Sequence, residues 1–126
     1  MAITSVNVSS PSNEIIYQDT VAANAVIGIK ASSAKVYYII VDNSLNVAAS
    51  YLKLWNTASG SVTLGVTAPD FIAYIPASAI ITIPFFTSAA NGITFGTALS
   101  YAVVTTAGTA GSSAPSSAVT MTVSYV

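Results

Sequence analysis

The strongest constraint on the fold is an alternation of apolar and polar side chains over residues 118–126. Apolar side chains occupy every second position from Val119 to Tyr125, and Thr120, Thr122 and Ser124 occupy the positions between them. Side chains two positions apart lie on the same face of an extended strand, so this segment predicts a strand with one buried face. A face of hydroxyl groups can meet another protein without removing ions from water. We therefore expect Thr120, Thr122 and Ser124 to contact a partner.

Segments with strand composition recur along the chain and are separated by short turn sequences. No segment sustains the period of an amphipathic helix. The other expected strands cover residues 21–30, 36–41, 51–55, 70–75, 79–86, 93–95 and 99–105. About eight strands without intervening helices predict an all-β protein, an antiparallel β-sandwich with a jelly-roll-like arrangement.

The length of the chain allows one such sandwich. A chain of 126 residues and 12.8 kDa can bury a single hydrophobic core. The first residues include Ser9, Ser10, Pro11 and Ser12, a composition typical of an extended segment outside a sheet. We predict an extended N-terminal arm over residues 1–13 and a single β-sandwich domain over residues 14–126.

Charged side chains are scarce and end at Asp70. They make up 6% of the chain, whereas a globular protein carries charge on about a quarter of its residues. The net charge of -1 provides little of the mutual repulsion that keeps proteins dispersed. We therefore expect a homo-oligomer, or a chain covered by other proteins.

The composition also argues against several classes of function. The chain has no cysteine, no histidine and no arginine, so it lacks thiolate nucleophiles, the usual zinc ligands and an imidazole base. Its three lysines do not cluster, so we expect no nucleic-acid binding. The apolar run 71–86 contains Pro76 and Pro84 and is shorter than the roughly 20 residues of a spanning helix, so we expect no membrane contact. We predict that the protein is not an enzyme and holds no cofactor or metal.

Two of the carboxylates, Asp42 and Asp70, adjoin turn sequences. Asp42 and Asp70 would form a general acid/base pair if two strands brought them together. Asp42, Asn43 and Asn46 offer oxygen ligands for calcium, although with a single carboxylate. Asp in a turn commonly accepts hydrogen bonds from nearby backbone amides, and we expect this structural role for both carboxylates.

A second candidate surface comes from residues 51–55. Tyr51, Lys53 and Trp55 alternate with two leucines, so they share one face of the predicted strand. We expect this exposed face to contact a partner. Other roles are open: Tyr51 and Trp55 stacking on a sugar, Trp55 packing under a loop or a neighbouring subunit, Lys53 lying over an aromatic ring, or Lys53 forming a crosslink to an asparagine.

Several segments carry a family resemblance. They are Val41-Asp42-Asn43-Ser44, Tyr51-Leu52-Lys53-Leu54-Trp55-Asn56, Ala68-Pro69-Asp70, residues 96–105, and residues 107–111 leading to Val119 and Tyr125. In this order they resemble small virion structural proteins of tailed bacteriophages, including phages of cyanobacteria. The resemblance covers roughly residues 36–126, is one of pattern and includes no catalytic signature.

The resemblance implies a sandwich-like protein located in the virion and assembled in the host cytoplasm. It implies a capsid decoration, or cement, protein that binds and stabilises the lattice of the major capsid protein, with other virion proteins as further partners. One alternative is a tail or short fibre component, in which the sandwich forms a trimer. An alternative from another class is a carbohydrate-binding module, which predicts a solvent-exposed Trp55.

Overall fold

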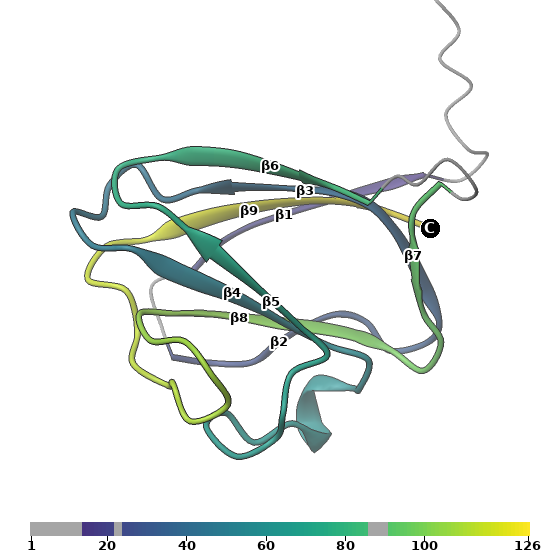
Figure 1. The fold of residues 1–126 in the computed structure, drawn as a ribbon. Helices are drawn as coiled ribbons and strands as arrows, with labels where there is room; N and C mark the ends of the chain where they lie inside the picture. The colour runs from purple at the N-terminus through teal and green to yellow at the C-terminus, as the bar shows by residue number, and fades with distance from the viewer. Residues whose placement is uncertain (1–13, 22–23, 86–90) are drawn as a thin grey trace, which may run out of the picture.

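Two antiparallel sheets stacked face to face form the protein (Figure 1). A computed structural model describes residues 14–21, 24–85 and 91–126. The strands are β1 (Ile15–Val21), β2 (Ile27–Lys30), β3 (Ala34–Asp42), β4 (Ser50–Trp55), β5 (Phe71–Ile75), β6 (Ile80–Pro84), β7 (Ile93–Phe95), β8 (Leu99–Val104) and β9 (Val119–Tyr125). The single helical element among these residues is a 3-10 turn, η1 (Ser59–Ser61). No helix in the described ranges is long and apolar enough to cross a membrane.

The strands pair in a nested order. Sheet A has the order β1-β9-β3-β6, with β7 also paired to β3, and sheet B has the order β2-β8-β4-β5. Strands from the two ends of the chain pair with each other (β1 with β9, β2 with β8), and strands nearer its middle pair likewise (β3 with β6, β4 with β5). Every pair is antiparallel, so the prediction of an all-β antiparallel sandwich is confirmed.

The core lies between the two sheets. Alternate residues of β9 and β4 enter it, as the period-two pattern predicts. Strand β3 contains a register irregularity between Val36 and Tyr38, which lets Val36 and Ile39 both face inward. The fully buried members of the core are Val36, Ile39, Val41, Leu52, Leu54, Ile75, Leu99, Tyr101, Val103, Val119, Met121 and Val123.

The N-terminal region departs from the sequence prediction. The expected strand over residues 21–30 is wrong, because β1 ends at Val21, β2 begins at Ile27 and residues 24–26 lie outside both strands. Strand β1 was not expected, since Asp19 interrupts the apolar positions of Ile15, Tyr17 and Val21. The predicted arm, residues 1–13, lies outside the described residues.

Candidate functional site

The outer face of sheet A brings together a broad set of side chains with little charge. The register places three rows of residues across β6, β3, β9 and β1. The rows are Pro84-Tyr38-Ser124-Ile16, Thr82-Ile40-Thr122-Gln18 and Ile80-Asp42-Thr120-Thr20. We call these residues the outer face of sheet A. Asp42 is its one charged member.

The predicted contact residues of β9 lie at the centre of this face. Thr120 and Thr122 are half-buried, and the hydroxyls of Thr120 and Thr20 are hydrogen-bonded at 3.3 Å. Ser124 is fully buried, and its hydroxyl donates to the carboxylate of Glu14. Two of the three predicted residues are thus accessible, whereas Ser124 is covered.

Asp42 remains ionised at the rim of this face. Hydrogen bonds from the hydroxyl and the backbone N–H of Ser44 lower the pKa of the Asp42 carboxyl, and the N–H lies 2.9 Å from Oδ1. The expected turn role of Asp42 is therefore confirmed.

The face expected from Tyr51, Lys53 and Trp55 is not an exposed face. Lys53 is fully buried and Trp55 is 1% exposed, so the prediction is wrong for both residues. Segments that follow β4 and β8 fold over the outside of sheet B. Trp55 Nε1 donates to the Thr67 carbonyl (3.1 Å), and Lys53 Nζ donates to the Gly111 carbonyl (2.6 Å). Packing of Trp55 under a loop, one of the open roles, is the observed one.

Trp55 and Lys53 are covered because the neighbouring strand, β8, is buried on both of its faces. All six of its residues are buried, although alternate residues of a strand point to opposite faces. Ala102 and Val104 on the outer side must therefore be covered, and the covering segments bury Trp55 and Lys53 as well. Sequence alternation does not reveal such a cover, because it comes from residues far along the chain.

Lys53 acts as an anchor for one of these segments. Burial lowers the pKa of its ammonium, because a charged group loses hydration inside the protein. The hydrogen bond described for this ammonium goes to a backbone carbonyl, not to an asparagine side chain. The contact with an aromatic ring occurs at another lysine, since Lys35 Nζ lies 5.9 Å from the centroid of Tyr37.

The side-chain amides of Asn43 and Asn46 form a buried polar network. Asn43 Nδ2 donates to the carbonyls of Ala48 (3.1 Å) and Pro76 (3.0 Å). Asn43 Oδ1 accepts from Asn46 Nδ2 and Ser50 Oγ, each at 3.0 Å. The amide groups are therefore used within the protein. No group of three or more possible acidic, histidine or cysteine ligands occurs among the described residues.

This network also extends to the segment before β9. Asn46 Nδ2 donates to the Ser117 carbonyl (3.0 Å), and Asn46 Oδ1 accepts from Ser117 N–H (2.8 Å). Ser78 N–H donates to the Asn46 carbonyl at 2.8 Å. The network thus joins the turn after β3, the turn before β6 and the entry to β9. The two asparagines in one turn sequence indicate such a network. Its partners distant in sequence, Ser78 and Ser117, could not be predicted from the sequence.

Asp70 has a backbone partner, as expected, but a distant one. Its Oδ2 accepts from Asn56 N–H at 2.7 Å, 14 residues earlier in the chain. Asp42 ends a strand of sheet A, whereas Asp70 precedes a strand of sheet B. Both carboxylates therefore hold backbone in place, and neither has a hydrogen bond to the other.

A third carboxylate, Asp19, joins the two sheets. Asp19 Oδ2 accepts from the hydroxyls of Tyr17 (3.0 Å) and Tyr101 (3.1 Å), whose rings meet edge to face at 6.1 Å between centroids. Burial is the main cause that raises the pKa of each tyrosine. Sequence reasoning missed this cluster, although an aspartate at an apolar position of β1 is the signal for a buried partner.

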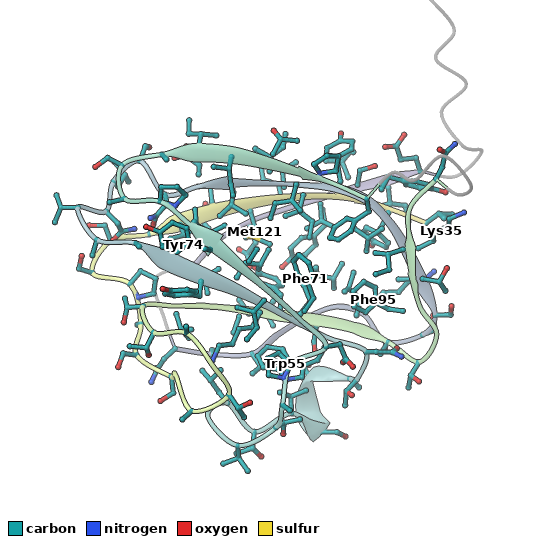
Figure 2. All side chains as sticks on the ribbon, viewed as in Figure 1. Lys35, Trp55, Phe71, Tyr74, Phe95 and Met121 are labelled. Carbon is teal, nitrogen blue, oxygen red and sulfur yellow. The ribbon has the colours of Figure 1, made fainter. Side chains whose placement is uncertain are left out.

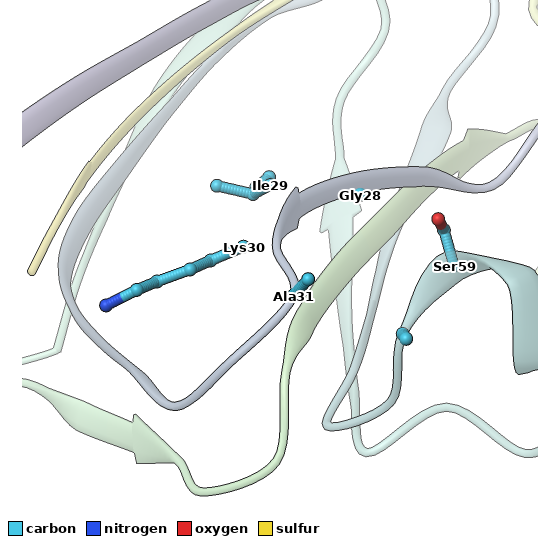
Figure 3. Close-up of a pocket in the computed structure, with 6 residues that line it drawn as sticks. Gly28, Ile29, Lys30, Ala31 and Ser59 are labelled. Atoms are coloured by element: carbon cyan, nitrogen blue, oxygen red, sulfur yellow. The ribbon is translucent and has the colours of Figure 1, made fainter.

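A shallow pocket lies between β2 and η1 (Figure 3). It has a volume of about 270 Å³ and is lined by Gly28, Ile29, Lys30, Ala31, Ala58 and Ser59. The side chains of Lys30 and Ser59 point away from each other, so they do not converge on a ligand. The outer face of sheet A is therefore the stronger candidate site.

Comparisons of the chain with known protein families, with curated proteins and with solved structures found no match.

Proposed function

We propose that the protein is a virion structural protein, a capsid decoration protein whose outer face of sheet A binds the lattice of the major capsid protein. The observation that carries this proposal is the composition of that face. Its three rows hold hydroxyl, amide and apolar side chains around Thr122, with one carboxylate in the rows at Asp42 and the carboxylate of Glu14 beside them on Ser124. A broad face with little charge suits a protein partner better than a small substrate.

The energetics of this face favour burial in an assembly. Hydroxyl groups can exchange water for hydrogen bonds with a partner, whereas buried ions need exact pairing. Ile16 and Ile80 are 53% and 61% exposed on this face. Covering what remains exposed of each side chain contributes about 1 kcal/mol. The isoleucines at two corners and the threonines between them give the face both affinity and polar contacts.

The order of the strands supports the same proposal. With β7 set aside, the pairing of β1 with β9, β2 with β8, β3 with β6 and β4 with β5 is that of a hairpin rolled into two sheets. We infer a jelly roll from this pairing. Jelly rolls are a common architecture of viral capsid domains and of lectins. The resemblance of residues 36–126 to phage virion proteins favours the capsid role.

The test is binding to capsids assembled from the major capsid protein of the same genome. We expect the protein to co-sediment with these capsids. Thr122→Lys places a charge at the centre of the outer face of sheet A and should weaken binding at least tenfold. Val47→Lys is the matched control, because Val47 is highly exposed outside this face and should bind like the unchanged protein.

Two outcomes would reject the capsid role. One is the absence of co-sedimentation, and the other is equal binding by Thr122→Lys and the unchanged chain. Recovery with tails or fibres instead of capsids would indicate the alternative of a tail or short fibre component. The solvent-exposed Trp55 that a carbohydrate-binding module predicts is not present, because the indole of Trp55 is covered and its N–H is bonded to the Thr67 carbonyl.

A further inference from the structure

The lateral edges of the sandwich differ in how they are protected. β1, β6 and β7 are edges of sheet A, and β2 and β5 are edges of sheet B. An edge strand has unpaired N–H and C=O groups that can pair with a strand of another chain. Proteins block such pairing with charged side chains, prolines, bulges and short strands.

Four of these edges carry such features, and β7 does so by its length of only three residues. β1 contains Asp19, which points inward to the hydroxyl of Tyr101. β2 has only four residues, an irregular register between Gly28 and Lys30, and the charge of Lys30. β6 ends at Pro84, which has no N–H to donate.

β5 lacks every one of these features. Its sequence, Phe-Ile-Ala-Tyr-Ile, contains no charge and no proline, and β4 is the strand paired with it. Phe71 packs against the core from inside the sandwich (Figure 2). On the outer side, Tyr74 is 57% exposed, Ile72 is also exposed, and the ring of Tyr74 contacts that of Tyr51 edge to face at 5.6 Å.

We propose that β5 pairs in antiparallel register with β5 of a second copy of this chain, about a twofold axis through Ala73. In this register Ala73 lies opposite the partner's Ala73, Ile72 opposite the partner's Tyr74, and Phe71 opposite the partner's Ile75. Small residues then meet small ones and large residues meet large ones on both faces of the joined sheet. An aromatic residue opposite a β-branched one is a favourable cross-strand pair.

The residues that flank β5 select this register. Asp70 and Pro76 lie just outside the ladder and oppose each other when Ala73 is at the centre. A shift of the centre to residue 72 places Asp70 opposite the partner's Tyr74. A shift to residue 74 brings Pro76 into the ladder, where it cannot donate a hydrogen bond. A shift that exchanges the two faces would expose the inner side chains.

A second copy fits this edge better than a charged partner does. β5 has no side chain that could pair with an ion, and its own sequence is complementary to itself. The contact is small compared with the roughly 1,200–2,000 Å² of a stable interface, so we expect a dimer that dissociates in the micromolar range. The inference does not rest on the proposed function, because it uses an edge of sheet B and leaves the outer face of sheet A free.

The absence of cysteine permits a direct test of the register. Residues opposite each other in an antiparallel pair have Cα atoms about 4.5–5.5 Å apart, within the range of a disulfide. We expect a mixture of the Ile72→Cys and Tyr74→Cys chains to form a disulfide-linked heterodimer under mild oxidation. Each variant alone should form much less, because like positions lie roughly 8 Å apart.

Val47→Cys is the control for random collision, since Val47 is highly exposed in the segment between β3 and β4 and is not part of the β5 ladder. Sedimentation equilibrium of the unchanged chain should show a monomer and dimer in exchange. Tyr74→Lys should weaken the dimer at least tenfold while the thermal unfolding of the monomer remains cooperative. A chain that stays monomeric at high concentration would overturn the proposal, as would a mixture that crosslinks no faster than Val47→Cys.

Discussion

Replacement of Asn43 by alanine tests the polar network that holds three turns together. Asn43 is fully buried and uses its whole amide, with two donated bonds to Ala48 and Pro76 and two accepted bonds from Asn46 and Ser50. Each hydrogen bond contributes about 1 kcal/mol, and the buried side chains of Asn46 and Ser50 would each lose a partner inside the protein. We therefore expect Asn43→Ala to lower the free energy of unfolding by about 4 kcal/mol. That is a large part of the stability of a domain of this size.

Urea denaturation followed by tryptophan fluorescence measures this loss, because Trp55 is the single tryptophan and is buried. For a protein of this size, a loss of about 4 kcal/mol lowers the midpoint by about 2–3 M urea. Leu45→Ala is the control, since Leu45 is exposed in the same turn and should change the free energy by no more than about 0.5 kcal/mol. A loss below about 1 kcal/mol for Asn43→Ala would refute the network.

Asn43→Asp adds a pH-dependent test at the same position. It retains the shape and the two accepted bonds, but an ionised carboxylate would face the carbonyls of Ala48 and Pro76. Folding should therefore raise the pKa of the introduced carboxyl above its value of about 3.9 in the unfolded chain. The variant should gain stability relative to the unchanged protein as the pH falls from 7 toward 4. The same pH dependence in both proteins would contradict this account.

Two further predictions concern a glycine and a buried tyrosine. Gly111→Ala should lower the free energy of unfolding by about 2 kcal/mol or more, because a Cβ at this position would lie 2.1 Å from the Thr106 carbonyl oxygen. Gly96→Ala is the control, since a Cβ there has nothing within 4 Å. Equal midpoints of the two variants in urea would refute the packing of this segment. Burial raises the pKa of Tyr101, so its hydroxyl stays protonated in the folded protein at pH values at which it ionises in the unfolded chain. Its contribution to the free energy of unfolding should be fully present below pH 10 and should fall as the pH rises further. Tyr101→Phe should show a shallower fall between about pH 10 and pH 11.5 in urea titrations, and an unchanged slope would contradict the buried hydroxyl. Lys53, whose lowered pKa acts in the opposite direction, is present in both proteins, so the difference reports on Tyr101 together with Tyr17, whose pKa depends on the Tyr101 hydroxyl.

Local patterns in the sequence identified most of the strands. The alternation from Val119 to Tyr125 predicted both the strand and the inward side of β9, because a strand in a two-layer protein must bury one face. Turn residues predicted the breaks between strands, and the structure confirms an antiparallel sandwich. The turn role of Asp42 was also predictable, since its partner Ser44 is two residues away.

Only the tertiary structure decided which faces remain accessible. Tyr51, Lys53 and Trp55 alternate like an exposed face, but residues that include Thr67 and Gly111 fold over Trp55 and Lys53. Exposure depends on what packs from elsewhere in the chain, and a local period carries no information about that. The sequence by itself thus determined a sparsely charged, two-layer β protein. The fold decided that the outer face of sheet A and the edge of β5, not the side of β4 that carries Trp55, are its open surfaces.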